Sequence, residues 1–344
     1  MAAEAPRNVI LLIGDGMGIG AIAAGRCGGP GRDGRLAVDT MPVTGFSITF
    51  SANALVTDSA AAGTALAAGV KTNNGVISMT PDGKPVKTIL ELAREMGKST
   101  GITSTKFITD ATPAVFVSHA DSRAKNEEIA VQMVASGVDV ILGGGRQFFL
   151  PKSAGGARAD DRNLLDEAAK SGYDVFESAE AMQKTAANKM IGLFAPNIMT
   201  SERPEPTIAE MTAKAIEALN RNRKGFFLMS EGGKIDSGGH ANDAGVAVKE
   251  MLMFDDAVRA ALDFAKKDGH TLVIVTADHD TGGFAIGEPN AENPKFTPGW
   301  VTNGHTANMV AIYAFGPGAE KYSGTHDNTE IPRIIAKLWG RKLN

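Results

Sequence analysis

Short apolar runs alternate with longer amphipathic segments along almost the whole chain, and this alternation constrains the fold more than any other feature. The apolar runs have the length of buried strands and cover residues 8–13, 99–104, 138–142, 226–230, 271–276 and 309–315. The segments predicted as helices are residues 86–96, 126–135, 162–170, 207–220, 243–267 and 330–339. Together they predict an α/β fold of three layers, a largely parallel central sheet flanked by helices.

The 344 residues, 43% of them hydrophobic, are enough to form one large domain, which we predict to span residues 7–340. Two stretches rich in glycine, proline and asparagine, at about 143–206 and 282–303, are predicted to be excursions from the sheet. In open α/β sheets, ligands bind outside the carboxyl ends of the strands. We therefore expect the active site there.

Charge and composition exclude several classes of protein. The net charge is −4 and the lysines and arginines are scattered, which disfavours a nucleic-acid partner. Cys27 is the single cysteine, so no intramolecular disulfide or thiolate cluster is expected. No apolar run approaches the roughly 18 residues of a membrane span, and residues 1–6 lack the basic and apolar regions of a signal peptide. We expect neither segment in the chain as given.

Acidic residues end three of the predicted strands. Asp15 follows residues 8–13, Glu231 follows residues 226–230, and Asp278 with His279 follows residues 271–276. The glycine-rich turn at 14–20 could instead cradle a nucleotide, but its Gly-x-Gly-x-Gly-x-Gly spacing differs from the dinucleotide fingerprint and includes Asp15. The strand ends therefore favour a cluster of acids over a nucleotide site.

Aspartates and histidines recur at spacings that suit a metal ion. Asp236 and His240 are four residues apart, which places them on one face of a helical turn. Asp278 and His279 offer a second pair, and His305 adds a further imidazole. Carboxylate oxygen and imidazole nitrogen suit Zn²⁺, and a ligand set without cysteine is typical of catalytic zinc. His119, His270 and His326 lack such neighbours and are predicted to be structural.

Residues 57–65, Thr-Asp-Ser-Ala-Ala-Ala-Gly-Thr-Ala, place Ser59 behind Asp58 at the start of an alanine-rich helix. Free N–H groups and the positive end of the helix dipole would stabilise an alkoxide or an anionic substrate there. Serine and aspartate are also ordinary helix caps, so this stretch alone leaves capping and catalysis open.

Two further motifs are ambiguous when taken alone. Asp110-Ala111-Thr112-Pro113 is a common turn, although the Thr112 hydroxyl could join the hard oxygen ligands that Mg²⁺ prefers. Arg123 offers the planar fork that fits two phosphate oxygens, although such an arginine is usually solvated surface.

Together these motifs closely resemble those of the alkaline phosphatases, from residue 8 to about residue 337. The resemblance rests on Ile13-Gly14-Asp15-Gly16-Met17-Gly18, Thr57-Asp58-Ser59-Ala60-Ala61, Asp110-Ala111-Thr112-Pro113 with Arg123, the stretch from Glu231 to His240, Thr276-Ala277-Asp278-His279, and Gly304-His305-Thr306. All six occur in the family's order.

The resemblance implies two Zn²⁺ and one Mg²⁺ per chain. Carried over by position, one zinc is held by Asp236, His240 and His305, and the second by Asp15, Asp278, His279 and the Ser59 oxygen. Asp15 also bridges to a magnesium completed by Thr112 and Glu231, with Asp110 contacting its water. Arg123 matches the phosphate clamp, and Asp58 orients it.

The implied activity is metal-dependent hydrolysis of phosphate monoesters of broad range, with an alkaline optimum and a phosphoserine on Ser59. Its small-molecule partners are the monoesters and inorganic phosphate, and the family implies a homodimer exported to the periplasm or the medium. Alternatives are a phosphodiesterase or phosphomutase of the same superfamily, or a non-catalytic relative that binds metal or phosphate.

The chain departs from the family at Ser237, where relatives usually carry a larger lysine, histidine or tryptophan that reaches toward the phosphate or the magnesium site. We expect the small hydroxyl to hold phosphate less tightly, so Ser237→Lys should lower the inhibition constant of inorganic phosphate. Only residues 281–304 stand where larger relatives carry long insertions, which predicts an open site.

Overall fold

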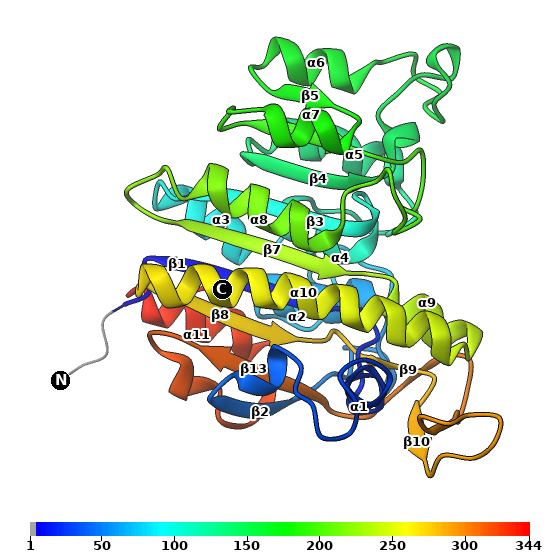
Figure 1. Cartoon of the computed structure of the whole chain (residues 1–344). Coiled ribbons are helices and arrows are strands. Elements are labelled where there is room, and N and C mark those ends of the chain that lie inside the picture. Colours follow the sequence, from blue (N-terminus) through cyan, green and yellow to red (C-terminus); the bar gives the residue numbers. More distant parts are fainter. Residues whose placement is uncertain (1–4) are drawn as a thin grey trace.

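A ten-stranded sheet forms the centre of the computed structural model, which describes residues 5–344 (Figure 1). In sheet order its strands are β14 (Gly324–Asp327), β2 (Val43–Ile48), β13 (Val310–Phe315), β8 (Thr271–Thr276), β1 (Asn8–Gly14), β7 (Phe226–Gly232), β3 (Ser99–Phe107), β4 (Val140–Gly144), β6 (Met190–Leu193) and β5 (Asp174–Phe176). Among these described strands only β13 is antiparallel to its neighbours. The predicted α/β fold with a largely parallel sheet is confirmed.

Helices cover both faces of the sheet. One face packs against α2 (Ser59–Ala68), α3 (Ile89–Glu95), α4 (Ala111–Val117), α5 (Asn126–Ala135), α6 (Leu164–Lys170) and α11 (Glu330–Leu338). The other packs against α1 (Ile19–Gly28), α7 (Ala179–Lys184), α8 (Ile208–Leu219), α9 (Ile235–Ala241) and α10 (Ala244–Asp268). Successive side chains of β1 alternate between the two cores, Leu11 and Ile13 on one side and Ile10 and Leu12 on the other.

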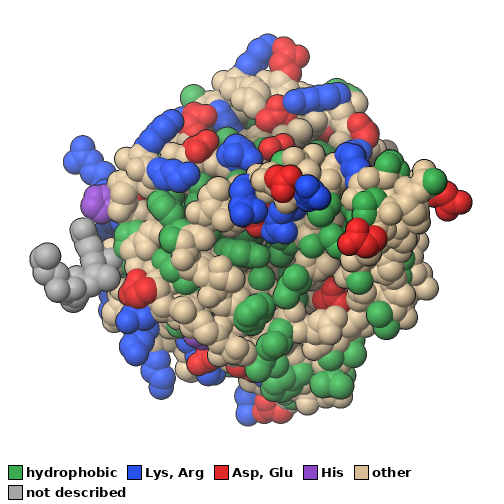
Figure 2. Space-filling model, turned by 60° about the horizontal axis from the view of Figure 1, so that its bottom comes forward, with side chains coloured by type: hydrophobic (Ala, Val, Ile, Leu, Met, Phe, Trp, Pro, Cys, Tyr) green, Lys and Arg blue, Asp and Glu red, His purple; other side chains and the backbone are tan. Residues whose placement is uncertain are grey.

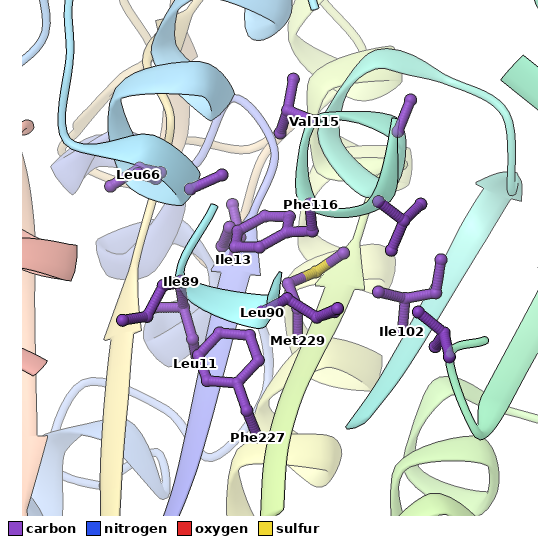
Figure 3. Close-up of a cluster of buried hydrophobic side chains, with 14 of the residues drawn as sticks. Leu11, Ile13, Leu66, Ile89, Leu90, Ile102, Val115, Phe116, Phe227 and Met229 are labelled. Atoms are coloured by element: carbon purple, nitrogen blue, oxygen red, sulfur yellow. The ribbon is translucent and has the colours of Figure 1, made fainter. Parts of the chain in front are cut away.

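The core on the α2 face holds the helix that carries Ser59 (Figure 3). Phe116 of α4 packs on Phe227 of β7 with ring centroids 6.0 Å apart. Every residue of α2 is buried, and its small residues allow a close approach to α4, since a Cβ on Gly63 would lie 3.0 Å from Val115 Cγ2. The position of Ser59 is therefore set by tight packing.

The segment at 143–206 differs from the prediction. It contains β5 and β6, which extend the sheet beyond β4, so describing it as an excursion from the sheet is wrong for these strands. The segment at 282–303 does leave the main sheet and forms a separate pair, β10 (Ala285–Gly287) with β11 (Thr297–Gly299). A third small sheet pairs β9 (Asp280–Thr281) with β12 (His305–Thr306).

Local chemistry explains where several elements begin. Helix α3 starts three residues later than predicted, because Thr88 accepts the Glu91 N–H while the Glu91 carboxylate accepts the Thr88 N–H. Short 3₁₀ turns occupy Val38–Thr40, Arg146–Phe148, Lys152–Ala154 and Ala319–Tyr322. None of the helices between residues 5 and 344 combines the length and the apolar content of a membrane span.

Candidate active site

The parallel strands bring three acids to one edge of the sheet, as predicted. Asp15 follows β1, Glu231 lies near the end of β7, and Asp278 follows β8. Residue Ile13 of β1 is in register with Glu231 and with Thr276, so the three acids leave adjacent strands at nearly the same level. All three are at most 1% exposed.

Asp236, His240 and His305 converge on one point. His240 Nε2 lies 3.3 Å from Asp236 Oδ1, His305 Nε2 lies 3.6 Å from that oxygen, and the two Nε2 atoms are 3.2 Å apart. Ligands of a tetrahedral zinc ion with bonds near 2 Å stand about 3.3 Å from each other. Both Nδ1 atoms face backbone carbonyls, of Asn303 and Thr57, and must donate to them, which leaves each Nε2 free as a ligand.

In a second group of four atoms, three oxygens surround His279 Nε2. Ser59 Oγ lies 3.1 Å from it, Asp278 Oδ2 3.2 Å and Asp15 Oδ1 3.6 Å. The backbone N–H groups of Gly16 and His279 both donate to the other Asp278 oxygen, Oδ1, which fixes that carboxylate. These distances again suit the ligands of one small metal ion.

Four buried oxygens of the site have no hydrogen-bond partner: Asp15 Oδ1, Thr112 Oγ1, Glu231 Oε1 and Asp278 Oδ2. A buried acceptor without a partner costs about 1–3 kcal/mol, and a cluster of such oxygens is suited to bind a cation. Thr112 and Glu231 belong to neither of the two groups above, and hard oxygens of this kind suit Mg²⁺. The residues present therefore fit three cations.

Burial and mutual repulsion shift the protonation of this cluster. Burial first, and then Asp15, raise the pKa of Glu231 to about 8. Burial and Asp236 raise the pKa of Asp278 to about 7. Burial lowers the pKa of His279 and His305 to about 4, so both imidazoles are neutral at pH 7, the form that binds a metal. The raised pKa values of the two carboxyl groups show that the acids of this site lack enough nearby positive charge to stay ionised.

Asp58, rather than Ser59, caps helix α2. Its Oδ1 accepts the Ala61 N–H at 3.0 Å, and its Oδ2 accepts from Arg123 Nη1 at 3.2 Å. Arg123 Nη2 donates to Asp110 Oδ1 at 3.0 Å. Burial disfavours the charged guanidinium, but Asp110 and Asp58 outweigh it and raise the pKa of Arg123. The arginine is thus fixed beside Ser59 with its charge retained.

Sequence reasoning missed Lys106. This lysine lies near the carboxyl end of β3, is 8% exposed, and its Nζ donates to Asp15 Oδ2 at 3.0 Å and to Asp236 Oδ2 at 3.1 Å. Burial opposes its charge, but Asp15 and Asp236 raise the pKa of Lys106 well above its usual value. The one signal in the sequence was a lysine directly after the small polar residues of a buried strand.

The other predicted residues lie as follows. Ser237 is half-buried on α9, next to Asp236. His119 contacts the Ser78 carbonyl and Glu91, and His326 contacts the Ser323 carbonyl. His270 precedes β8, at the end of the strand opposite Asp278. These three histidines are outside both ligand groups.

We expect Gly16→Ala to weaken zinc binding about 10- to 100-fold, the range found when groups that orient metal ligands are changed. Gly16 has a φ of +68°, and a Cβ there would lie 2.6 Å from Thr281 Oγ1 and 2.8 Å from the Asp236 Cα. Both Asp236 and Thr281 would have to move. Zinc affinity is measured by competition with a chromophoric chelator.

Gly31→Ala is the matched control for this substitution. Gly31 has a φ of +90° and no atom within 4 Å of a Cβ, so alanine there meets only the backbone cost of about 1–2 kcal/mol. Zinc affinity should be unchanged in Gly31→Ala. Equal affinities in both variants would show that the space beside Gly16 does not position the ligands.

Comparisons with known proteins agree with this site. The family model for alkaline phosphatase matches residues 6–298 and 288–340. Alkaline phosphatase 4 of Bacillus subtilis is 36% identical, with 96% of this chain and 88% of the relative covered, and Escherichia coli alkaline phosphatase is 34% identical, with 98% and 86% covered. The alkaline phosphatase of the Antarctic bacterium TAB5 superposes with a TM-score of 0.90 at 36% identity over 99% of both chains. The chain belongs to the alkaline phosphatase family of phosphate monoester hydrolases.

Proposed function

We propose that the chain hydrolyses phosphate monoesters in two displacements, with Ser59 as the nucleophile. The observation that carries this proposal is the place of Ser59 Oγ, 3.1 Å from His279 Nε2 at the first turn of the buried helix α2. The helix start offers free N–H groups to the phosphoryl oxygens, and Arg123 stands beside it, fixed by Asp58 and Asp110.

In the first displacement the Ser59 oxygen forms a bond to phosphorus while the bond to the alcohol oxygen breaks, which leaves a phosphoserine. In the second, a water oxygen bonds to phosphorus and the bond to Ser59 breaks, releasing inorganic phosphate. Two inversions give overall retention at phosphorus. Throughout, Arg123 holds the equatorial oxygens, where a loose phosphoryl-transfer transition state carries charge.

We assign two Zn²⁺ and one Mg²⁺ to the site. The two groups that contain imidazole, Asp236–His240–His305 and Asp15–Asp278–His279–Ser59, suit zinc, and the oxygens of Asp15, Thr112 and Glu231 suit magnesium. When bound, such ions act as Lewis acids toward the attacking and leaving oxygens. A solved structure of a TAB5 alkaline phosphatase variant is described as holding magnesium.

The substrate range should be broad and the optimum alkaline, as the family resemblance implies. Two side chains of the site reach the protein surface, since Arg123 is 30% and His240 44% exposed. The alcohol portion of a bound substrate would therefore project into solvent. The charged side chains of the site would bind the phosphoryl group and not the alcohol portion, so substrates with different alcohols should be accepted.

The direct test is turnover of p-nitrophenyl phosphate and of bis(p-nitrophenyl) phosphate from pH 6 to pH 11 in zinc and magnesium. We expect the monoester to be hydrolysed far faster, with activity rising into the alkaline range. Faster hydrolysis of the diester would favour the phosphodiesterase alternative. No hydrolysis of either compound by fully metal-loaded protein would favour the non-catalytic one.

We also propose that the enzyme is a homodimer. Five large apolar side chains are exposed in one part of the fold: Phe46 and Ile48 on β2, Phe50 and Leu55 in the segment that follows it, and Met309 directly before the neighbouring strand β13. Figure 2 shows hydrophobic side chains gathered on one face of the molecule. Leu55 is 74% exposed. Patches of this kind mark protein interfaces, and a second copy would cover it.

Sedimentation velocity tests the dimer. Leu55→Asp should shift the protein to monomer, whereas Ile198→Asp should not, because Ile198 is an exposed side chain that follows β6, toward the opposite end of the sheet from β2. A wild-type monomer, or a dimer that survives Leu55→Asp, would contradict the proposed interface.

Export to the periplasm or the medium is a proposal that rests on the family resemblance. Nothing in the site requires a reducing compartment, because its ligands are carboxylates, imidazoles and hydroxyls. Fractionation of cells that express the native gene tests this, with activity expected outside the cytoplasm. Activity confined to the cytoplasm would contradict it.

A further inference from the structure

Lys106 reaches the centre of the site from β3. Ser104 and Lys106 lie where the register of β3 against β4 shifts, and the Ser104 hydroxyl donates to Glu231 and accepts the Lys106 N–H. The stem of Lys106 passes over Gly233, where a Cβ would lie 2.7 Å from Lys106 Cγ. A side chain at position 233 would therefore collide with the stem of Lys106, and glycine there avoids this collision. Gly233 lies on the turn between β7 and α9, three residues before Asp236.

Lys106 and Arg123 share an acid. Lys106 Nζ lies 3.8 Å from Asp110 Oδ2, while Asp110 Oδ1 accepts from Arg123 Nη2 at 3.0 Å. Two cations therefore stand on either side of one carboxylate, both near Ser59 and its ligand group. Asp110 fixes their separation.

The ammonium of Lys106 leaves the ligand oxygens open. It donates to Asp15 Oδ2 and Asp236 Oδ2, but Asp15 Oδ1, Thr112 Oγ1, Glu231 Oε1 and Asp278 Oδ2 keep no partner. Lys106 is thus an additional charge beside the cation positions and does not satisfy their free oxygens. When Asp15 and Asp236 bind metal ions, their negative charge is largely neutralised by those ions. The buried ammonium of Lys106 then requires a further anion to balance its own charge.

We propose that this anion is the phosphoryl group, so that Lys106 is a phosphate-binding residue that works together with Arg123. Lys106 thereby provides, from β3, the cation that the small side chain of Ser237 cannot offer from α9. This inference rests on the proposed phosphatase function.

The test is the binding of inorganic phosphate to the zinc- and magnesium-loaded enzyme, followed by calorimetry and by product inhibition. Lys106→Met keeps the length of the stem and removes the charge, and we expect about 10- to 100-fold weaker binding, the effect of a lost charge-assisted hydrogen bond. Lys106→Arg should keep binding within a few fold. Zinc and magnesium content, measured by mass spectrometry, should stay at the wild-type level in both.

Lys214→Met is the matched control. Lys214 is likewise buried, at 5% exposed, and is hydrogen-bonded to the Thr185 carbonyl and Glu217, but it lies on α8 outside the site. Its replacement should leave phosphate binding unchanged. Unaltered phosphate binding in metal-replete Lys106→Met would overturn the proposal, and so would a loss explained by missing metal.

A double substitution keeps the proposal testable if Lys106→Met proves unstable. Ser237→Lys should tighten phosphate binding more in the Lys106→Met background than in the wild type, because the new ammonium then replaces a missing one. Equal tightening in both backgrounds would mean that the two positions act independently, against the proposal. Failure of the proposed function would appear in the wild type itself, as absent monoester hydrolysis.

Discussion

Ser59→Ala should lower kcat for p-nitrophenyl phosphate by roughly 10³-fold or more, the size of loss that follows removal of a catalytic nucleophile. The Ser59 side chain contributes little else to the structure. Its hydroxyl forms a hydrogen bond with His279, and the cap of α2 is Asp58. Alanine is also the best helix former, so the free energy of unfolding should change by less than about 1 kcal/mol.

The measurement pairs single-turnover kinetics with zinc content, because Ser59 Oγ is itself part of the second ligand group. We expect both zinc ions to remain, since His279, Asp15 and Asp278 still converge. Ser178→Ala is the control: it removes a true helix cap on α7, should cost about 1 kcal/mol, and should leave kcat unchanged. Substantial turnover in metal-loaded Ser59→Ala would contradict the assignment of the nucleophile.

The central strands were predictable because both of their faces are buried. β1 and β8 are continuous apolar runs, and the predicted bounds of β8 agree with the structure. Strands toward the two ends of the sheet were missed for the opposite reason. β2 alternates buried and exposed residues, and β5 has only three residues, so neither forms a continuous apolar run.

The convergence of the three acids, and of Asp236 with His240, was predictable from local rules, since acids that follow parallel strands must meet at one edge and residues four apart share a helix face. Lys106 follows no such rule. Its partners Asp15 and Asp236 are 91 and 130 positions away in the sequence, and only the order of β1, β7 and β3 in the sheet brings them together. The pairing of Thr112 with Glu231 likewise depends on the fold and rested on the family resemblance.

Chelation should abolish activity, and full recovery should require zinc and magnesium together. The reason is the set of free ligand atoms: four buried oxygens lack partners, and two groups converge at the spacing of zinc ligands. Ions that bind only the folded chain also stabilise it, by about 4 kcal/mol at a concentration 1,000 times the dissociation constant. Melting temperature and turnover of p-nitrophenyl phosphate should therefore fall together in EDTA and return together. Recovery with magnesium alone would contradict the zinc pair.

The metal-free protein should also lose stability as the pH rises from 6.5 to 8. Burial raises the pKa of Glu231 from 4.5 to about 8, so the folded chain holds this proton where the unfolded chain has released it, and the free energy of unfolding falls as the pH rises through that window. One such group accounts for about 2 kcal/mol across the interval. Asp278 shifts in the same direction, while His279 and His305, whose pKa is lowered, change the stability in the opposite sense and mainly below pH 6.5.

Urea unfolding at pH 6.5, 7 and 8, with and without metals, measures this dependence. In the metal-loaded enzyme the carboxylates are already ionised as ligands, so the fall should disappear. Metal-free Glu231→Gln has no proton to lose at that position and should show a shallower fall than the metal-free wild type. An identical fall in the two metal-free proteins would mean that Glu231 is already ionised without metal, and its burial beside Asp15 would then have to be compensated by Lys106, whose Nζ donates to Asp15.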